Sequence, residues 1–288
     1  MAEKIDSHQH FWNYDAAEYG WIGENMKALR RDYLPSDLAK EMAQRGVKRS
    51  VAVQARQTVG ETRWLLGLAA ENSSIAGVVG WMPLVSEGLE EQLAALPNRA
   101  ALKGLRHVLQ DEPDDELMRS PEFNRGLEAV KEAGLTYDVL VYEGQMESAI
   151  ALVDRHPELR FVLDHTGKPR IADGVMEPWR TRLKELAQRP NVYCKLSGMV
   201  TEADWNGWSA NALEPYAKTV LESFGPERTM FGSDWPVCLV AASYARWCDT
   251  VQGWIEEFSA EERDAVMGGT AARVYGIEET DGQMEENG

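Results

Sequence analysis

The sequence predicts a single-domain α/β protein, a (β/α)8 barrel, and three observations lead to this fold class. The chain has 288 residues, which is close to the typical length of one such barrel. Eight short apolar segments alternate with amphipathic segments of helical period. Several of these short segments are apolar nearly throughout, as parallel strands covered on both faces are. The expected strands are Lys4–His8, Arg49–Gln54, Ile75–Met82, Leu102–Leu109, Thr136–Tyr142, Arg160–His165, Asn191–Leu196 and Arg228–Ser233.

Helical segments with recognisable ends lie between these strands. Ser36–Arg45 begins with a serine after Pro35 and ends at Gly46, while Ser120–Ala133 begins at a Ser-Pro pair and ends at Gly134. Regular alternation of strands and helices favours a parallel sheet that closes on itself. The remaining expected helices are Glu61–Glu71, Met146–Arg155, Pro178–Gln188, Ala212–Phe224 and Tyr244–Phe258.

The alternative architecture is an open, doubly wound sheet. Such a sheet places a glycine-rich phosphate turn after its first strand, but the turn here is Ser7–His10 and contains no glycine. The closed barrel is therefore preferred. We expect it to occupy residues 1–276, and we expect the acidic, glycine-containing segment 277–288 to be a disordered tail.

Charge and composition exclude several classes of protein. The formal net charge of −17 offers no basic surface for nucleic acid or for an anionic membrane. The N-terminus lacks the apolar core of a signal peptide, and no run of about 18 apolar residues predicts a membrane span. Cys194, Cys238 and Cys248 are odd in number and form no CxxC pair, which favours a reducing compartment. We therefore expect a cytoplasmic protein with a small-molecule partner.

The expected active site lies where barrel strands end, because functional groups of this fold gather at the carboxyl ends of the strands. The first strand runs into His8 and His10, which share one side of the strand with Asp6 below them. Two imidazoles two residues apart can bind one Zn²⁺. Taken alone, an HxH pair also suits a purely structural role.

Two further titratable residues follow later strands. His165 ends the sixth strand with the inward parity of Phe161 and Leu163, which would turn Asp164 outward into the helix layer. Asp234 follows the eighth strand, after a small glycine-containing end and before a proline. An aspartate in such a turn also suits a helix cap, so spacing alone leaves its role open.

Substrate-binding candidates come from three other strand ends. Arg106 and His107 have opposite parity on the fourth strand, so only one of them can face the barrel axis. Lys195 on the seventh strand is equally consistent with the surface and with the barrel mouth, and Gln54 follows the second strand. Tryptophans near strand ends offer flat apolar faces to a sugar ring, although core packing is the commoner use of this residue. These tryptophans are Trp12, Trp81 and Trp235.

This pattern resembles the amidohydrolase superfamily, and within it the branch of sugar-lactone hydrolases. The resemblance rests on contiguous motifs and runs over nearly the whole chain, to about Gly276. The motifs are DSHQHFW (Asp6–Trp12), DHTGKP (Asp164–Pro169), KLSG (Lys195–Gly198) and FGSDWPV (Phe231–Val237).

The resemblance implies a role for each matched position. Asp234 corresponds to a general base, His8, His10 and His165 to its histidine partners, and Arg106 with His107 to a substrate-binding pair. Members with two metals carry a bridging Lys or Glu on the fourth or fifth strand. No matching residue stands there, because Lys103 is near the start of its strand and the fifth strand offers only Asp138. We therefore expect at most one divalent ion, with Zn²⁺ held by His8, His10, His165 and Asp234 if it is bound at all.

The expected reaction is hydrolysis of a sugar-acid lactone by a water molecule that Asp234 activates. Two alternatives remain open at this point. One is a different superfamily reaction, the hydrolysis or decarboxylation of another ring acid, and the other is a barrel that binds sugars without turnover. A homo-oligomer is compatible with the sequence.

Overall fold

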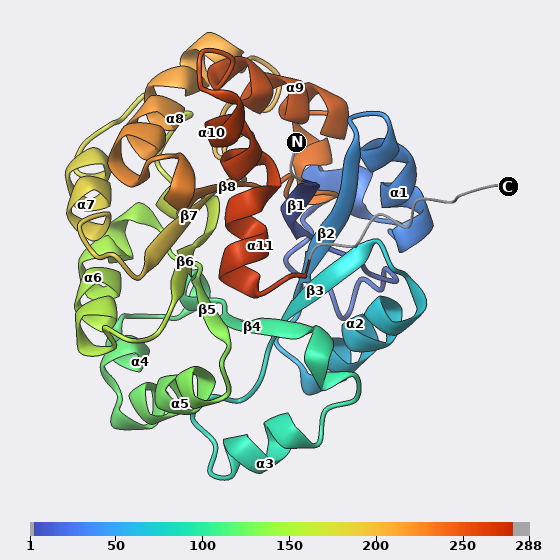
Figure 1. Cartoon of the computed structure of the whole chain (residues 1–288), viewed down its shortest axis with the longest axis vertical. Helices are drawn as coiled ribbons and strands as arrows, with labels where there is room; N and C mark the ends of the chain where they lie inside the picture. The colour runs from blue at the N-terminus through green and yellow to red at the C-terminus, as the bar shows by residue number, and fades with distance from the viewer. Residues whose placement is uncertain (1–2, 279–288) are drawn as a thin grey trace, which may run out of the picture.

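The computed structural model describes residues 3–278, and its eight parallel strands form one sheet in the order β1 to β8. The sheet closes where β1 meets the segment after β8, because Asp234 N–H donates to the His8 carbonyl oxygen (2.8 Å) and His10 N–H to that of Trp235 (2.7 Å). The predicted barrel is confirmed (Figure 1). The strands are β1 (Lys4–Gln9), β2 (Val47–Val53), β3 (Ile75–Gly80), β4 (Leu102–His107), β5 (Thr136–Val139), β6 (Phe161–Leu163), β7 (Val192–Leu196) and β8 (Thr229–Phe231).

Helices form the outer layer around this sheet (Figure 1). Side chains cap several of them as their sequences predict, and the hydroxyl of Ser120, for example, accepts the backbone N–H of Phe123. None of the helices within residues 3–278 is long and apolar enough to cross a bilayer. The helices are α1 (Pro35–Ala43), α2 (Val59–Glu71), α3 (Leu89–Ala94), α4 (Glu116–Arg119), α5 (Pro121–Glu132), α6 (Met146–Arg155), α7 (Trp179–Leu186), α8 (Ala210–Phe224), α9 (Tyr244–Trp254), α10 (Ala260–Asp264) and α11 (Thr270–Tyr275).

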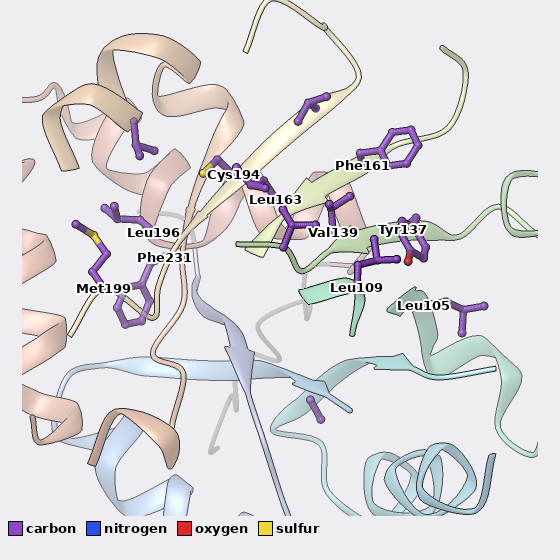
Figure 2. Packing of buried hydrophobic residues seen from close by; sticks show 14 of the residues in the cluster. Leu105, Leu109, Tyr137, Val139, Phe161, Leu163, Cys194, Leu196, Met199 and Phe231 are labelled. Atoms are coloured by element: carbon purple, nitrogen blue, oxygen red, sulfur yellow. The ribbon is translucent and has the colours of Figure 1, made fainter. Parts of the chain in front are cut away.

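Two hydrophobic clusters show which face of each strand is inside. The larger cluster joins the strands to the helices, and Figure 2 shows its side chains from β4 to β8, among them Leu105, Tyr137, Leu163 and Leu196. Since neighbouring residues on a strand point to opposite faces, the residues between these outward side chains point into the barrel. The inward positions therefore include Arg106, Asp138 and Lys195.

The smaller cluster fills the barrel interior near the amino ends of the strands. It combines strand residues such as Ile5, Val162 and Met230 with Val274 and Tyr275 of α11. Helix α11 lies across this end of the barrel (Figure 1). Ile277 also belongs to this cluster, while residues 279–288 of the expected acidic tail lie outside the described residues.

Strands β6 and β8 end earlier than expected. The expected strands extended to His165 and Ser233, but β6 ends at Leu163 and β8 at Phe231. The chain then turns into the left-handed region, with φ of 51° at His165 and 57° at Asp234. This conformation is unfavourable for residues with a Cβ atom and is found most often at functional sites.

Candidate functional site

Three histidines surround one carboxylate at the carboxyl ends of β1, β6 and β8. One oxygen of Asp234 lies 3.8 Å from His8 Nε2, 3.4 Å from His10 Nε2 and 3.9 Å from His165 Nε2. All four residues are buried, with at most 5 % of their surface exposed. The predicted convergence of these residues is therefore confirmed.

Two glycines make room for the histidine rings. A Cβ atom on Gly198, whose φ is +66°, would lie 2.4 Å from His165 Nδ1, and one on Gly232 would lie 2.8 Å from His8 Cβ. Any larger residue at either position would push an imidazole out of place. This close approach explains why the KLSG and FGSD motifs contain glycine at these points.

A network of buried charges lies directly below the histidines. Lys195 Nζ lies 2.5 Å from Asp138 Oδ2, 3.0 Å from Asp164 Oδ1 and 3.1 Å from His8 Nδ1. Arg106 Nη1 donates to Asp164 Oδ2 at 2.8 Å. The Tyr275 hydroxyl donates to Asp138 at 2.8 Å, so the network reaches α11. Every charged member is thus paired, which buried ions require.

The network corrects one expectation and resolves two open questions. Asp164 does not face the helix layer, because the outward residues of β6 are Phe161 and Leu163, which gives Asp164 the inward parity. Lys195 lies inside the barrel and not on the surface. Of the β4 pair, Arg106 faces the axis. The sequence carried a signal for the network, because Arg106, Asp138 and Lys195 are charged residues within expected barrel strands.

Hydrogen bonds determine which nitrogen of each histidine carries the proton. Burial lowers the pKa of His8 well below its usual value, so its ring is neutral. The Lys195 ammonium donates to His8 Nδ1, and His8 Nε2–H then donates to His10 Nε2 at 3.2 Å. His10 Nδ1–H donates to the Val53 carbonyl oxygen at 2.8 Å. These tautomers satisfy the three hydrogen bonds together.

His165 and Asp234 both have lowered pKa values and are both deprotonated near pH 7. Burial lowers the pKa of His165 to about 4, so the ring is neutral near pH 7. Burial opposes ionisation of Asp234, but its contacts with His165 and His10 hold its pKa below the usual value. Asp234 is therefore an ionised carboxylate beside a neutral His165 ring, which suits a base that accepts a proton from water.

The same residues form two groups that could hold a metal ion. Donor atoms of His8, His10 and Asp234 lie within 4.8 Å of one another, and so do those of His8, Asp164 and His165. The first group offers two imidazoles and a carboxylate, a ligand set that suits Zn²⁺.

A cavity of about 420 Å³ opens above the histidines and Asp234. Its floor includes His10, Arg106, His165 and Asp234. Loops between strands and helices supply the walls, which combine aromatic and charged side chains. These wall residues include Trp21, Asp111, Tyr142, Lys168, Glu202 and Trp205. A pocket of this size with convergent polar groups suits a small polar ligand.

The structure corrects the tryptophan assignments. Trp12 and Trp235 do not reach the cavity, because they are at most 2 % exposed and pack against Tyr33 in the hydrophobic core. Trp81 lies outside the cavity wall, and its indole N–H donates to His107 Nδ1. The aromatic residues that do line the cavity come from long loops, where hydrophobic periodicity gives no signal.

Two other expected substrate contacts lie away from the cavity. His107 is held by Glu112, whose carboxylate lies 2.6 Å from His107 Nε2. Gln54 is fully buried, and its backbone carbonyl accepts a hydrogen bond from Arg106 Nη2 at 2.5 Å. In this structure neither side chain lines the cavity, and Gln54 supports Arg106 through its backbone.

Comparison with known proteins identifies the family. A family model described as amidohydrolase matches residues 5–277. The chain belongs to this amidohydrolase family. An L-fucono-1,5-lactonase from Burkholderia multivorans is 47 % identical, with 96 % of this chain and 97 % of the relative covered. Another, from Burkholderia ambifaria, is 37 % identical, with 99 % of each chain covered.

A solved structure extends the comparison to three dimensions. The crystal structure of an amidohydrolase from Burkholderia multivorans with bound zinc matches with a TM-score of 0.94 and 46 % identity. The match covers 96 % of this amidohydrolase and 100 % of that one. Both the predicted fold and the resemblance to the amidohydrolase superfamily are thus confirmed.

Proposed function

We propose that this amidohydrolase hydrolyses a sugar-acid lactone, L-fucono-1,5-lactone or a related L-galactono-type lactone, to the open acid. One observation carries the proposal, namely the Asp234 carboxylate surrounded by three histidines at the floor of a cavity of about 420 Å³, a size that suits a small sugar. Relatives named as L-fucono-1,5-lactonases align over nearly their full length. They favour this reaction over a different ring-acid reaction and over a non-catalytic barrel.

The first step is the attack of water on the lactone carbonyl. Asp234 accepts a proton from the water molecule, and the new C–O bond forms at the carbonyl carbon. Negative charge then develops on the carbonyl oxygen. The His165 ring can stabilise it, because Ser197 Oγ lies 2.9 Å from Nδ1 and can donate there, which leaves the proton on Nε2 facing the cavity.

The second step opens the ring. The bond between the carbonyl carbon and the ring oxygen breaks, and the departing oxygen takes the proton that Asp234 received from water. The water molecule is thus added across the ester bond, and Asp234 returns to its ionised form. A lactone is already an activated ester, so no covalent intermediate is required.

The donor atoms at the site fit one divalent ion, most simply Zn²⁺. His10 donates Nδ1–H to the Val53 carbonyl, which leaves its Nε2 lone pair available, as a metal ligand requires. His8 would need its proton on Nδ1, directed at Asp164 Oδ1 3.3 Å away. His8, His10 and Asp234, with help from His165, would hold the ion. When bound, it would polarise the carbonyl and acidify water.

Metal analysis tests this assignment. We expect at most one equivalent of metal per chain, and we expect lactonase activity to persist after dialysis against a chelator, because Asp234 can act as a base without a metal. Two equivalents per chain would contradict the single site. Complete loss of activity that Zn²⁺ restores would show that the reaction depends on the ion.

A pH-indicator screen of aldonolactones tests the reaction itself. We expect L-fucono-1,5-lactone and L-galactono-type lactones to be opened faster than acyclic esters or amides of similar size, because the cavity is compact and its base is directed at water. The spontaneous rate without enzyme serves as the baseline. The proposal fails if an amide is hydrolysed faster than every aldonolactone tested.

A further inference from the structure

The cavity contains two cationic side chains besides its histidines, and a carboxylate holds each of them. Among the described residues that line the cavity, these cations are Arg106 and Lys168. Arg106 is paired with Asp164 at 2.8 Å, and Lys168 Nζ lies 3.4 Å from Glu202 Oε1. A ligand carboxylate would therefore compete with Asp164 for Arg106 and with Glu202 for Lys168.

The backbone holds the two residues of the Lys168–Glu202 pair in place. Lys168 ends a left-handed turn that starts at His165, and its own φ is 47°. The backbone of Glu202 is held across from it, because Ala172 N–H donates to the Glu202 carbonyl oxygen at 2.9 Å. The side chains of the pair are only 15 % and 23 % exposed, so solvent screens their attraction weakly.

The other charges on the cavity surface are negative. Asp111 and Asp234 line the same cavity as Glu202. A lactone with a free carboxylate would thus meet three acidic residues and no unpaired cation, and its carboxylate would lose its hydration without compensation. A neutral sugar lactone would instead find donors and acceptors for its hydroxyl groups in the same ion pair.

We propose that Glu202 is a specificity-determining residue which, by pairing with Lys168, restricts this amidohydrolase to neutral sugar lactones and excludes lactones that carry a carboxylate. Glu202 acts by forming an ion pair with Lys168, the wall cation that could otherwise bind an anionic substituent of the substrate. The proposal rests on the lactonase function proposed above and names the substrate class of that site.

A matched pair of substrates tests the idea. L-Galactono-1,4-lactone and galactarolactone are hexose-derived lactones that differ in carrying a hydroxymethyl group or a carboxylate at one end. The measured quantity is the ratio of kcat/KM for galactarolactone to that for L-galactono-1,4-lactone. We expect this ratio to be low for the wild type and to rise ~10-fold or more in Glu202→Gln, as one charge-assisted contact predicts.

Two control variants distinguish the effect of breaking the Lys168–Glu202 ion pair from the effect of removing a negative charge from the cavity. Asp111→Asn also removes one negative charge from the cavity wall but releases no cation, so we expect its ratio to change less than ~3-fold. The double variant Lys168→Met with Glu202→Gln removes the released cation, and its ratio should return to the wild-type level. Glu202→Ala provides the same charge change if the glutamine variant does not fold, as judged by its melting temperature.

The outcomes are distinguishable. An unchanged ratio in Glu202→Gln, an equal rise in Asp111→Asn, or comparable wild-type turnover of both lactones would each overturn the specificity proposal while lactonase activity stands. Failure of the wild type to open any lactone would refute the proposed function, and the specificity proposal with it. The specificity proposal is supported if the kcat/KM ratio rises only in the Glu202 variants and if adding Lys168→Met abolishes that rise.

Discussion

Asp234→Asn should lower kcat by at least ~100-fold, the lower range for loss of a general base. The amide has the shape of the carboxylate but cannot accept a proton from water between His10 and His165. Substrate affinity should change less, because Arg106 and the cavity walls remain. The rate is measured with a pH indicator and L-fucono-1,5-lactone as substrate.

The melting temperature of Asp234→Asn decides how its rate is interpreted. The amide keeps the size of the carboxylate, so we expect the barrel to stay folded despite the loss of the contacts that lower the pKa of Asp234. Asp111→Asn on the cavity wall is the matched control, and it should retain most of its turnover of the neutral lactone. Near-normal kcat in a folded Asp234→Asn protein would refute the assignment of the base.

Lys195→Met should lower the free energy of unfolding by about 3–5 kcal/mol, the usual cost of breaking a buried ion pair. The methionine fills a similar volume but leaves Asp138 and Asp164 without the cation that both contact. Lys195 also holds the pKa of Asp164 well below its usual range against the effect of burial. Urea denaturation monitored by tryptophan fluorescence measures the loss.

Two further variants test the cause of that loss. Lys218→Met on α8 removes an exposed lysine paired with Glu214 and should change stability by less than about 0.5 kcal/mol. Adding Asp138→Asn to Lys195→Met should recover part of the stability, because Asp138 is the carboxylate left without a cation, while Asp164 keeps Arg106. A cost below about 1 kcal/mol for Lys195→Met would show that the network is not needed for stability.

The prediction of the fold and of the central site from sequence depended on local regularities. Short apolar segments alternating with amphipathic ones determined the barrel, because strand and helix periodicity are properties of neighbouring residues. The HxH pair, the histidine after the sixth strand and the aspartate after the eighth were each identifiable, because barrel strands all deliver their last residues to one mouth. Their convergence followed from topology alone.

Tertiary structure decided the orientation of the side chains that surround this site. Asp164 was wrongly placed outside, because Phe161 and Leu163 were expected to face inward but pack against the helices. The left-handed turn after β6 then brings His165 to the barrel mouth against the alternation of the strand. The sequence could not pair Lys195 with Asp138, because the two residues are 57 positions apart.

The residues that form the cavity walls could not be predicted from the sequence either. Trp12 and Trp235 were expected there, but they fill the core, and Trp21, Tyr142 and Trp205 take the wall positions. The sequence by itself thus determined the barrel and the identity of its central acid and histidines, which local patterns encode. Only the tertiary structure decided the charge pairing and the walls, because those contacts join different strands and loops, and separation in sequence carries no information about their distance in space.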